Sequence, residues 1–253
     1  MKAKQITSFL ESYFPLSLQE KWDCCGLQIG SLDSDVTSVL VALNADEDAL
    51  DKAMDNGCNM VITHHPFLLE KIPNYDLQQS AGRFMKKALD HEIVVYSLHT
   101  CLDKGKNGIS MNDWLLQALG VQGSHRYDLS GIGKKGQLQP SITVDAFIAQ
   151  VKMAFDVPII RYSRHTKKSI ASVAICGGSG ADDITSVVGQ VDCFITGDTK
   201  YRHMKYAKEH DILLLDVGHH AEVIMEKKIA ELLEGLIPTV VASSEDYYQY
   251  RGM

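Results

Sequence analysis

Six side chains of types that bind metal ions stand directly after three segments that the sequence predicts as β-strands. In chain order they are His64, His65, His99, Asp103, His219 and Glu222. In an open α/β sheet, ligands bind beyond the carboxyl ends of the strands. Imidazole nitrogens and carboxylate oxygens, without cysteine, suit zinc, iron, manganese, cobalt or nickel. The sequence therefore predicts a site for divalent metal ions at these strand ends.

The spacing of these side chains predicts two ions rather than one. His64 and His65 are adjacent, and adjacent side chains on an extended chain point apart, so each can serve a different ion. His219 and Glu222 stand three residues apart at the start of a predicted helix, which places both on one face. A carboxylate can bridge two ions about 3.5–4 Å apart. The predicted metal ligands are His64, His65, Asp103, His219 and Glu222.

The other histidines have different predicted roles. His99 stands beside the ligands and is the candidate catalytic residue, either as a general acid or base or as a group that orients Asp103 or a substrate. His91 and His210 each precede a strand, where they can cap a helix end. We expect His125, His165 and His203 at the surface, and His220 takes no part in the site.

Predicted strands and helices alternate along the chain. Strands are expected at residues 37–43, 59–63, 93–98, 172–176, 193–196 and 212–217, and helices at 2–13, 46–56, 79–90, 111–119, 144–156 and 221–236. Residues 129–142 are rich in Gly and Lys and are expected to form a surface connection. Alternation of this kind predicts an α/β architecture with a largely parallel or mixed sheet.

The chain also repeats itself. Residues 41–65 align without a gap on residues 174–198, and residues 91–103 align on 210–222, where Asp103 meets Glu222. We infer an internally duplicated α/β unit with mixed sheets flanked by helices. The predicted domains are 1–125 plus 219–253 for the first half with the C-terminal helix, and 126–218 for the second half.

Composition narrows the function class. The 253 residues are 45% hydrophobic and 23% charged, and the net charge is −7, which gives no general attraction to nucleic acid or to an anionic membrane. The N-terminus has no signal-peptide pattern, and no run of about 18 apolar residues predicts a membrane span. The six cysteines form no C-x-x-C pair, and we expect reduced thiols in a cytoplasmic protein.

Two features near the predicted ligands have no assigned role. GGSG at 177–180 lies between a strand and a helix, and it is either a phosphate cradle or a tight turn. Asp198 and Lys200 follow the strand at 193–196, and they either face the same site or lie in a solvated loop.

Taken in order, several short motifs resemble one known family over nearly the whole chain. They are WDCCGLQIG (22–30), ITHHP (62–66), HTCLD (99–103), NGISMNDWL (107–115), TGDTKY (196–201) and DVGHHAE (216–222). This series resembles the NGG-interacting-factor-three-like proteins, called GTP cyclohydrolase 1 type 2 homologs in bacteria. The sequence departs from the family pattern at Asn44, where Asp is frequent, and at Cys24-Cys25, where Asn-Val is usual.

The resemblance implies a duplicated α/β fold and a toroidal homohexamer with dinuclear metal sites facing an internal cavity. It implies the same five ligands as the strand ends, with Glu222 bridging the two ions. It also implies a hydrolase that opens a purine nucleotide such as GTP at a C–N bond. The alternative is a non-enzymatic metal-binding or regulatory ring that binds a nucleotide or a protein partner, and the sequence leaves both functions open.

Overall fold

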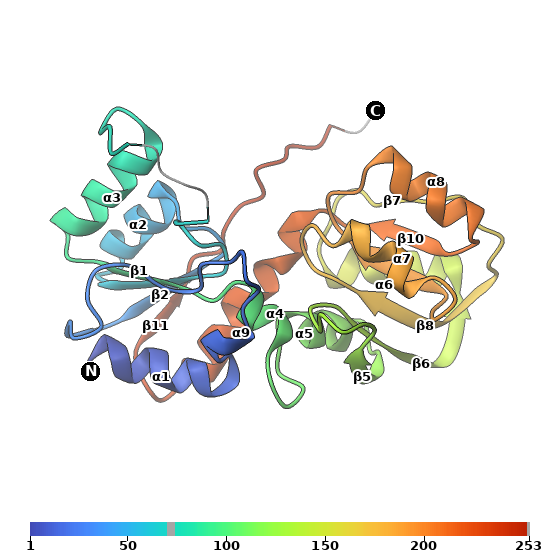
Figure 1. Ribbon diagram of the computed structural model, residues 1–253, viewed down its shortest axis with the longest axis horizontal. Coiled ribbons are helices and arrows are strands. Elements are labelled where there is room, and N and C mark those ends of the chain that lie inside the picture. The colour runs from blue at the N-terminus through green and yellow to red at the C-terminus, as the bar shows by residue number, and fades with distance from the viewer. Residues whose placement is uncertain (70–73, 252–253) are drawn as a thin grey trace. The chain divides into compact units, whose positions relative to one another are not determined.

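The computed structural model describes residues 1–69 and 74–251 (Figure 1). The chain divides into two compact units, each built around its own sheet. Unit 1 comprises Met1–Asn107 and Met225–Glu245, and unit 2 comprises Gly108–Ile224 and Asp246–Met253. Among the described residues, no helix is long and apolar enough to cross a bilayer.

Unit 1 contains a five-stranded mixed sheet in the order β1-β4-β3-β2-β11. The strands are β1 (Gly26–Ile29), β2 (Val39–Ala42), β3 (Met60–Thr63), β4 (Val94–Ser97) and β11 (Thr239–Val241). The helices of this unit are α1 (Ala3–Tyr13), α2 (Glu47–Asp55), α3 (Ser80–Asp90), α4 (Thr100–Lys104) and α9 (Ile224–Leu233), with the 3-10 turn η1 (Leu16–Leu18). Strands β2, β3, β4 and β11 run parallel, and β1 is antiparallel to β4.

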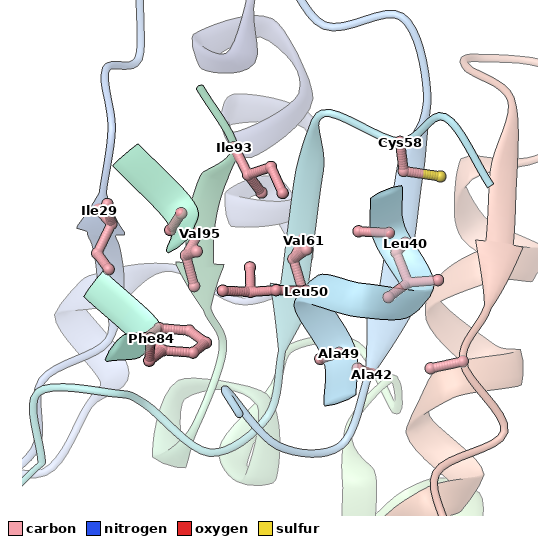
Figure 2. Close-up of a cluster of buried hydrophobic side chains, with 13 residues drawn as sticks. Ile29, Leu40, Ala42, Ala49, Leu50, Cys58, Val61, Phe84, Ile93 and Val95 are labelled. Carbon is pink, nitrogen blue, oxygen red and sulfur yellow. The ribbon is translucent and has the colours of Figure 1, made fainter. Parts of the chain in front are cut away.

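Both faces of the unit 1 sheet are covered, which explains why its central strands are apolar throughout. Figure 2 shows Val61 and Val95 of the sheet packed with Leu50 of α2 and Phe84 of α3. Helices α1 and α9 lie on the opposite face (Figure 1). There, the hydroxyl of Tyr96 donates a hydrogen bond to Glu11 of α1.

Unit 2 contains a six-stranded mixed sheet in the order β5-β6-β8-β9-β10-β7. The strands are β5 (Gln122–Arg126), β6 (Lys134–Thr143), β7 (Arg161–Tyr162), β8 (Ser169–Ile175), β9 (Cys193–Thr196) and β10 (Leu213–Asp216). The helices are α5 (Met111–Ala118), α6 (Val144–Ala154), α7 (Ile184–Val187) and α8 (Tyr201–Glu209), with 3-10 turns η2 (Ala181–Asp183) and η3 (His219–Val223). Strands β8, β9 and β10 are parallel, whereas β7 is antiparallel to β10.

The secondary structure confirms the predicted duplication at two pairs of strands. Strand β3 ends at Thr63 and β9 ends at Thr196, which are 133 positions apart, as in the sequence alignment. Strands β4 and β10 begin at Val94 and Leu213, which are 119 positions apart. Each unit therefore has a parallel three-stranded centre with an antiparallel strand beside the third strand.

Two predictions of secondary structure were wrong in part. Residues 129–142 are not only a surface connection, because β6 occupies Lys134–Thr143 and pairs with β5 and β8. Its sequence, KKGQLQPSIT, carries few apolar residues, so the pairing comes from its neighbours in the sheet rather than from its own pattern. The predicted helix at 221–236 is instead the 3-10 turn η3 followed by α9, which ends at Leu233.

Candidate metal centre

In unit 1, three histidine rings gather where two neighbouring strands end. Strands β3 and β4 are parallel and in register, with Thr63 opposite Ser97, so the residues after them reach the same edge of the sheet. The ring centroids lie 4.9 Å apart for His64 and His65, 5.0 Å for His64 and His99, and 5.8 Å for His65 and His99. One ring nitrogen from each lies within 4.8 Å of the others, a group that could hold a metal ion.

Asp103 joins this group from helix α4. Its Oδ1 atom lies 3.8 Å from Nε2 of His64, and both side chains are buried. The short helix α4 begins directly after His99, so the turn from Thr100 carries Asp103 back toward the strand end. The structure thus brings His64, His65, His99 and Asp103 together in unit 1.

Hydrogen bonds orient the rings of His64 and His65. Nδ1 of His64 lies 3.0 Å from the carbonyl oxygen of Leu98, and Nδ1 of His65 lies 2.7 Å from Oδ1 of Asn44. An oxygen acceptor at Nδ1 favours the neutral tautomer with its proton there and its lone pair on Nε2. Asn44 therefore orients His65 with an amide oxygen.

His99 is oriented by Asp23, a residue whose role the sequence analysis missed. Oδ1 of Asp23 lies 2.8 Å from Nδ1 of His99, and Oδ2 accepts hydrogen bonds from the backbone N–H of Thr100 and from its hydroxyl. Burial raises the pKa of Asp23, but the hydrogen bonds from His99 and Thr100 outweigh it and hold the pKa well below its usual range. The indole of Trp22 packs edge-on against His99, with 5.8 Å between ring centroids. The signal was present in the Trp-Asp of the 22–30 motif.

In unit 2, His219 and Glu222 face each other on the 3-10 turn η3. Because a 3-10 helix has three residues per turn, side chains three apart are eclipsed, and Nε2 of His219 lies 3.2 Å from Oε2 of Glu222. Nδ1 of His219 lies 2.7 Å from Oδ2 of Asp198. The hydrogen bond that His219 donates to Glu222, together with Asp198 and against the effect of burial, raises the pKa of His219 to about 9.

The Gly-rich turn at 177–180 packs closely against these two side chains. A Cβ on Gly178, whose φ is +59°, would lie 2.6 Å from Oε1 of Glu222 and 3.1 Å from Nε2 of His219. A Cβ on Gly177 would lie 3.1 Å from the same carboxylate oxygen. The helical segments that follow the turn, η2 and α7, are short. The geometry favours the tight turn over the phosphate cradle, since its glycines leave space for Glu222.

Asp198 and Lys200 follow β9, and the structure gives each a role. Asp198 orients His219, and the backbone N–H of Lys200, which precedes α8, donates to Nδ1 of His203. The expectation that His203 lies at the surface was wrong, because its ring is buried and Nε2 lies 2.9 Å from Oδ1 of Asp182. The turn into α8 brings the ring inward, since His203 is the third residue of that helix.

Comparisons with known proteins agree with this fold. The model of the family Duf34/NIF3 (NGG1p interacting factor 3) matches residues 1–246. A protein of Clostridium acetobutylicum called GTP cyclohydrolase 1 type 2 homolog is 32% identical, over 99% of this chain and 98% of that protein. A protein of Streptococcus pneumoniae with the same name is 33% identical, over 92% of this chain and 90% of that protein.

Solved structures show the same fold. The Bacillus cereus protein related to NIF3 superposes with a TM-score of 0.91 at 20% identity, covering 99% of both chains. Reduced HcgD from Methanocaldococcus jannaschii superposes with a TM-score of 0.85 at 26% identity, covering 96% of this chain and 98% of that one. With the family model matched from residue 1 to residue 246 and curated relatives above 30% identity, the chain belongs to the Duf34/NIF3 family.

Proposed function

We propose that this protein holds two divalent metal ions with His64, His65, Asp103, His219 and Glu222, and that it is a metal-dependent hydrolase of a nucleotide. One observation carries the proposal. In each unit, every histidine of the donor group has an oxygen acceptor at Nδ1, so that Nε2 is the nitrogen presented for coordination. Supporting acceptors of this kind are typical of histidines that bind metals.

The charge of the donor group also fits divalent ions. Asp103 and Glu222 are 7% and 3% exposed, and a buried carboxylate is costly unless a positive charge compensates it. Two divalent cations supply four positive charges against these two negative ones. Oxygen and imidazole donors suit zinc, iron, manganese, cobalt or nickel.

The chemistry follows from the same residues. Divalent ions in a two-metal site lower the pKa of a bound water and polarise the group under attack. Asp103 and Glu222 bring negative charge to the site, and Glu222 is the proposed bridge. His99 acts as the general acid or base, because Asp23 holds the proton on Nδ1 and leaves Nε2 to accept or donate one.

The substrate class rests on the relatives. Those that share about a third of the sequence are called GTP cyclohydrolase 1 type 2 homologs, which favours a purine nucleotide and attack at a C–N bond of its ring. The negative chain would then receive its anionic substrate through the local positive charge of the ions.

The test measures metal content and turnover on one preparation purified without chelator. Elemental analysis counts the ions, and chromatography follows GTP and a panel of other nucleotides. We expect two ions per chain and product formation that Glu222→Gln abolishes. The matched control is Glu231→Gln on α9, an exposed carboxylate that pairs with Lys228 and should change neither readout. No metal, or turnover unchanged in Glu222→Gln, would contradict the proposal.

The second candidate function is a metal-binding or regulatory ring without turnover. The description of the family names an interacting factor, which favours a protein partner. Two ions per chain without product from any nucleotide would favour this candidate. We also propose that the chain forms a toroidal homohexamer. Size-exclusion chromatography coupled to light scattering would test this by comparing the particle mass with the mass of six chains.

A further inference from the structure

Helix α8 and the segment after β7 enclose a cavity in unit 2 that contains none of the proposed metal donors. Its volume is about 560 Å³, within the range of small-molecule sites. The lining residues are Tyr162, Ser163, Arg164, Tyr201, Met204, Lys205, Lys208 and Glu209. The proposed function uses none of these residues, so the cavity is available for a different ligand.

The helical wall of the cavity is one face of α8. Tyr201, Met204, Lys205 and Lys208 stand at positions i, i+3, i+4 and i+7, which share a helix face. Met204 is half-buried and packs on the core of the unit, so it forms an apolar floor. Tyr201 is 88% exposed at the beginning of the helix. A large aromatic ring is therefore held at the rim without a packing role in the core.

The opposite wall is the edge of the sheet. Strand β7 pairs with β10, with Tyr162 opposite Leu215. The hydroxyl of Ser163 donates to the carbonyl of Ile212 and accepts from the N–H of Leu214, each at 3.0 Å, which fixes the segment that follows. The ring of Tyr162 is 55% exposed. Two tyrosines from different elements thus line one cavity.

The cavity has a positive lining in a negative chain. Lys205 pairs with Glu209 at 3.7 Å, and Glu209 is the one carboxylate among the described residues that line the cavity. Arg164 and Lys208 are different, because neither has an ion-pair partner among residues 1–69 and 74–251. Arg161 and Arg202 nearby do have carboxylate partners. Two uncompensated cations beside two tyrosines suit an anion that carries an aromatic ring.

We propose that this cavity is a binding site for a nucleoside phosphate. The base stacks on Tyr201, and the phosphate pairs with Arg164 and Lys208. The cavity volume suits a single nucleotide rather than a strand, and the net charge of −7 opposes binding of a polyanion. Because the metal donors take no part, the site stands whether or not the proposed hydrolase activity exists.

The experiment is calorimetric titration of the full-length chain with GMP, guanosine and inorganic phosphate. The protein carries Glu222→Gln, so that nucleotide binding by the metal donors is removed. We expect GMP to bind more tightly than guanosine or phosphate, and Arg164→Glu with Lys208→Glu to weaken GMP at least tenfold. The matched control is Lys152→Glu with Lys168→Glu, two exposed lysines of the same unit outside the cavity, which should leave GMP binding unchanged.

A second pair of variants tests the stacking. Tyr201→Ala should weaken GMP by at least about fivefold, whereas Tyr201→Phe keeps the ring and should retain the affinity. When Glu222 is left intact, the cavity variants should keep the metal content of the parent chain. That result would show that the variants fold and that the cavity is separate from the proposed metal site.

Three outcomes would overturn the site. One is equal GMP affinity in the Arg164→Glu, Lys208→Glu variant and in its control. Another is GMP binding that Glu222→Gln alone removes, since the nucleotide would then sit at the metal donors. The third is a single-stranded oligonucleotide that binds more tightly than GMP and responds to the same two charges, which would make the feature part of a nucleic-acid groove.

Discussion

Oδ2 of Asp198 lies 2.7 Å from Nδ1 of His219, and the backbone of Asp198 adopts a positive φ of 52°. Asp198 thus orients a proposed ligand from a backbone conformation that few residues tolerate. Asp198→Gly keeps the conformation and removes the acceptor, and we expect it to lower metal affinity about 10- to 100-fold. Asp198→Asn also tolerates positive φ and retains an amide oxygen, as Asn44 does for His65, so its loss should be smaller. Competition with a chromogenic chelator measures both, and equal affinity in Asp198→Gly and the parent chain would argue against this role.

Gly178 and Gly189 provide a matched pair for the close packing of the Gly-rich turn. Both have positive φ, +59° and +77°, but a Cβ on Gly189 would meet nothing within 4 Å, whereas one on Gly178 would meet Glu222 and His219. Alanine at either position should cost about 1–3 kcal/mol of stability through backbone strain. Only Gly178→Ala should also lower the number of ions per folded chain. Urea unfolding and elemental analysis give the two readouts, and equal metal loss in both variants would assign the effect to strain alone.

The sequence was sufficient to predict that His64, His65 and His99 meet at one edge of the unit 1 sheet. That arrangement depends on the order of neighbouring elements along the chain. The two predicted strands that precede His64 and His99 are short and apolar, and a predicted helix at 79–90 lies between them. A right-handed crossover places such strands side by side. Their carboxyl ends then coincide, and the side chains that follow must be neighbours. The shifts of 133 and 119 residues likewise match the observed strands, and their difference, 133 − 119 = 14 residues, reflects a shorter connection from β9 to β10 than from β3 to β4.

The residues that orient the rings were harder to find from sequence. Asp23 lies 76 positions before His99, and the two segments come together through long-range contacts such as the pairing of β1 with β4. Strand β6 was missed for a related reason, because its polar sequence has no strand pattern and its pairing with β8 is a property of the whole sheet. Long-range pairing of this kind has no local signal in one sequence.

Replacing Phe84 tests the hydrophobic core that supports the sheet edge where His64, His65 and His99 lie. It is 2% exposed, packs in the cluster of Figure 2 and lies 4.5 Å, between ring centroids, from Phe67. Phe84→Ala should lower the free energy of unfolding by about 3–5 kcal/mol, through lost burial and the cavity that remains. Leu89→Ala on the same helix is the control, since Leu89 is 55% exposed and its loss should stay within about 0.5 kcal/mol. Urea unfolding measures both, and similar losses would show that the cluster does not support the unit.

The hydrogen bonds of Asp192 indicate that unit 2 loses stability at acidic pH. Its Oδ2 accepts hydrogen bonds from the N–H groups of Ala171 and Ser172, at 3.1 Å each, and from the hydroxyl of Ser172 at 2.9 Å. Burial raises the pKa of Asp192, but these bonds and Lys167 outweigh it, so the pKa lies below its ordinary value of 3.8. A lowered pKa means that the folded state favours the carboxylate, so the stabilisation is present above the unfolded pKa and is lost as the pH falls through the folded one.

Asp192→Asn should therefore unfold more easily than the parent chain at pH 7, and the difference should shrink as the pH falls below about 3.8. Urea unfolding of both proteins at neutral and acidic pH measures it. Asp211→Asn is a useful comparison, because Asp211 also has a lowered pKa, caused by hydrogen bonds from Thr166, but its carboxylate is less buried than that of Asp192. Solvent screens an exposed carboxylate, so Asp211→Asn should change stability less at pH 7. A gap between parent and Asp192→Asn that stays constant down to pH 2 would show that the carboxylate charge is not what stabilises the fold.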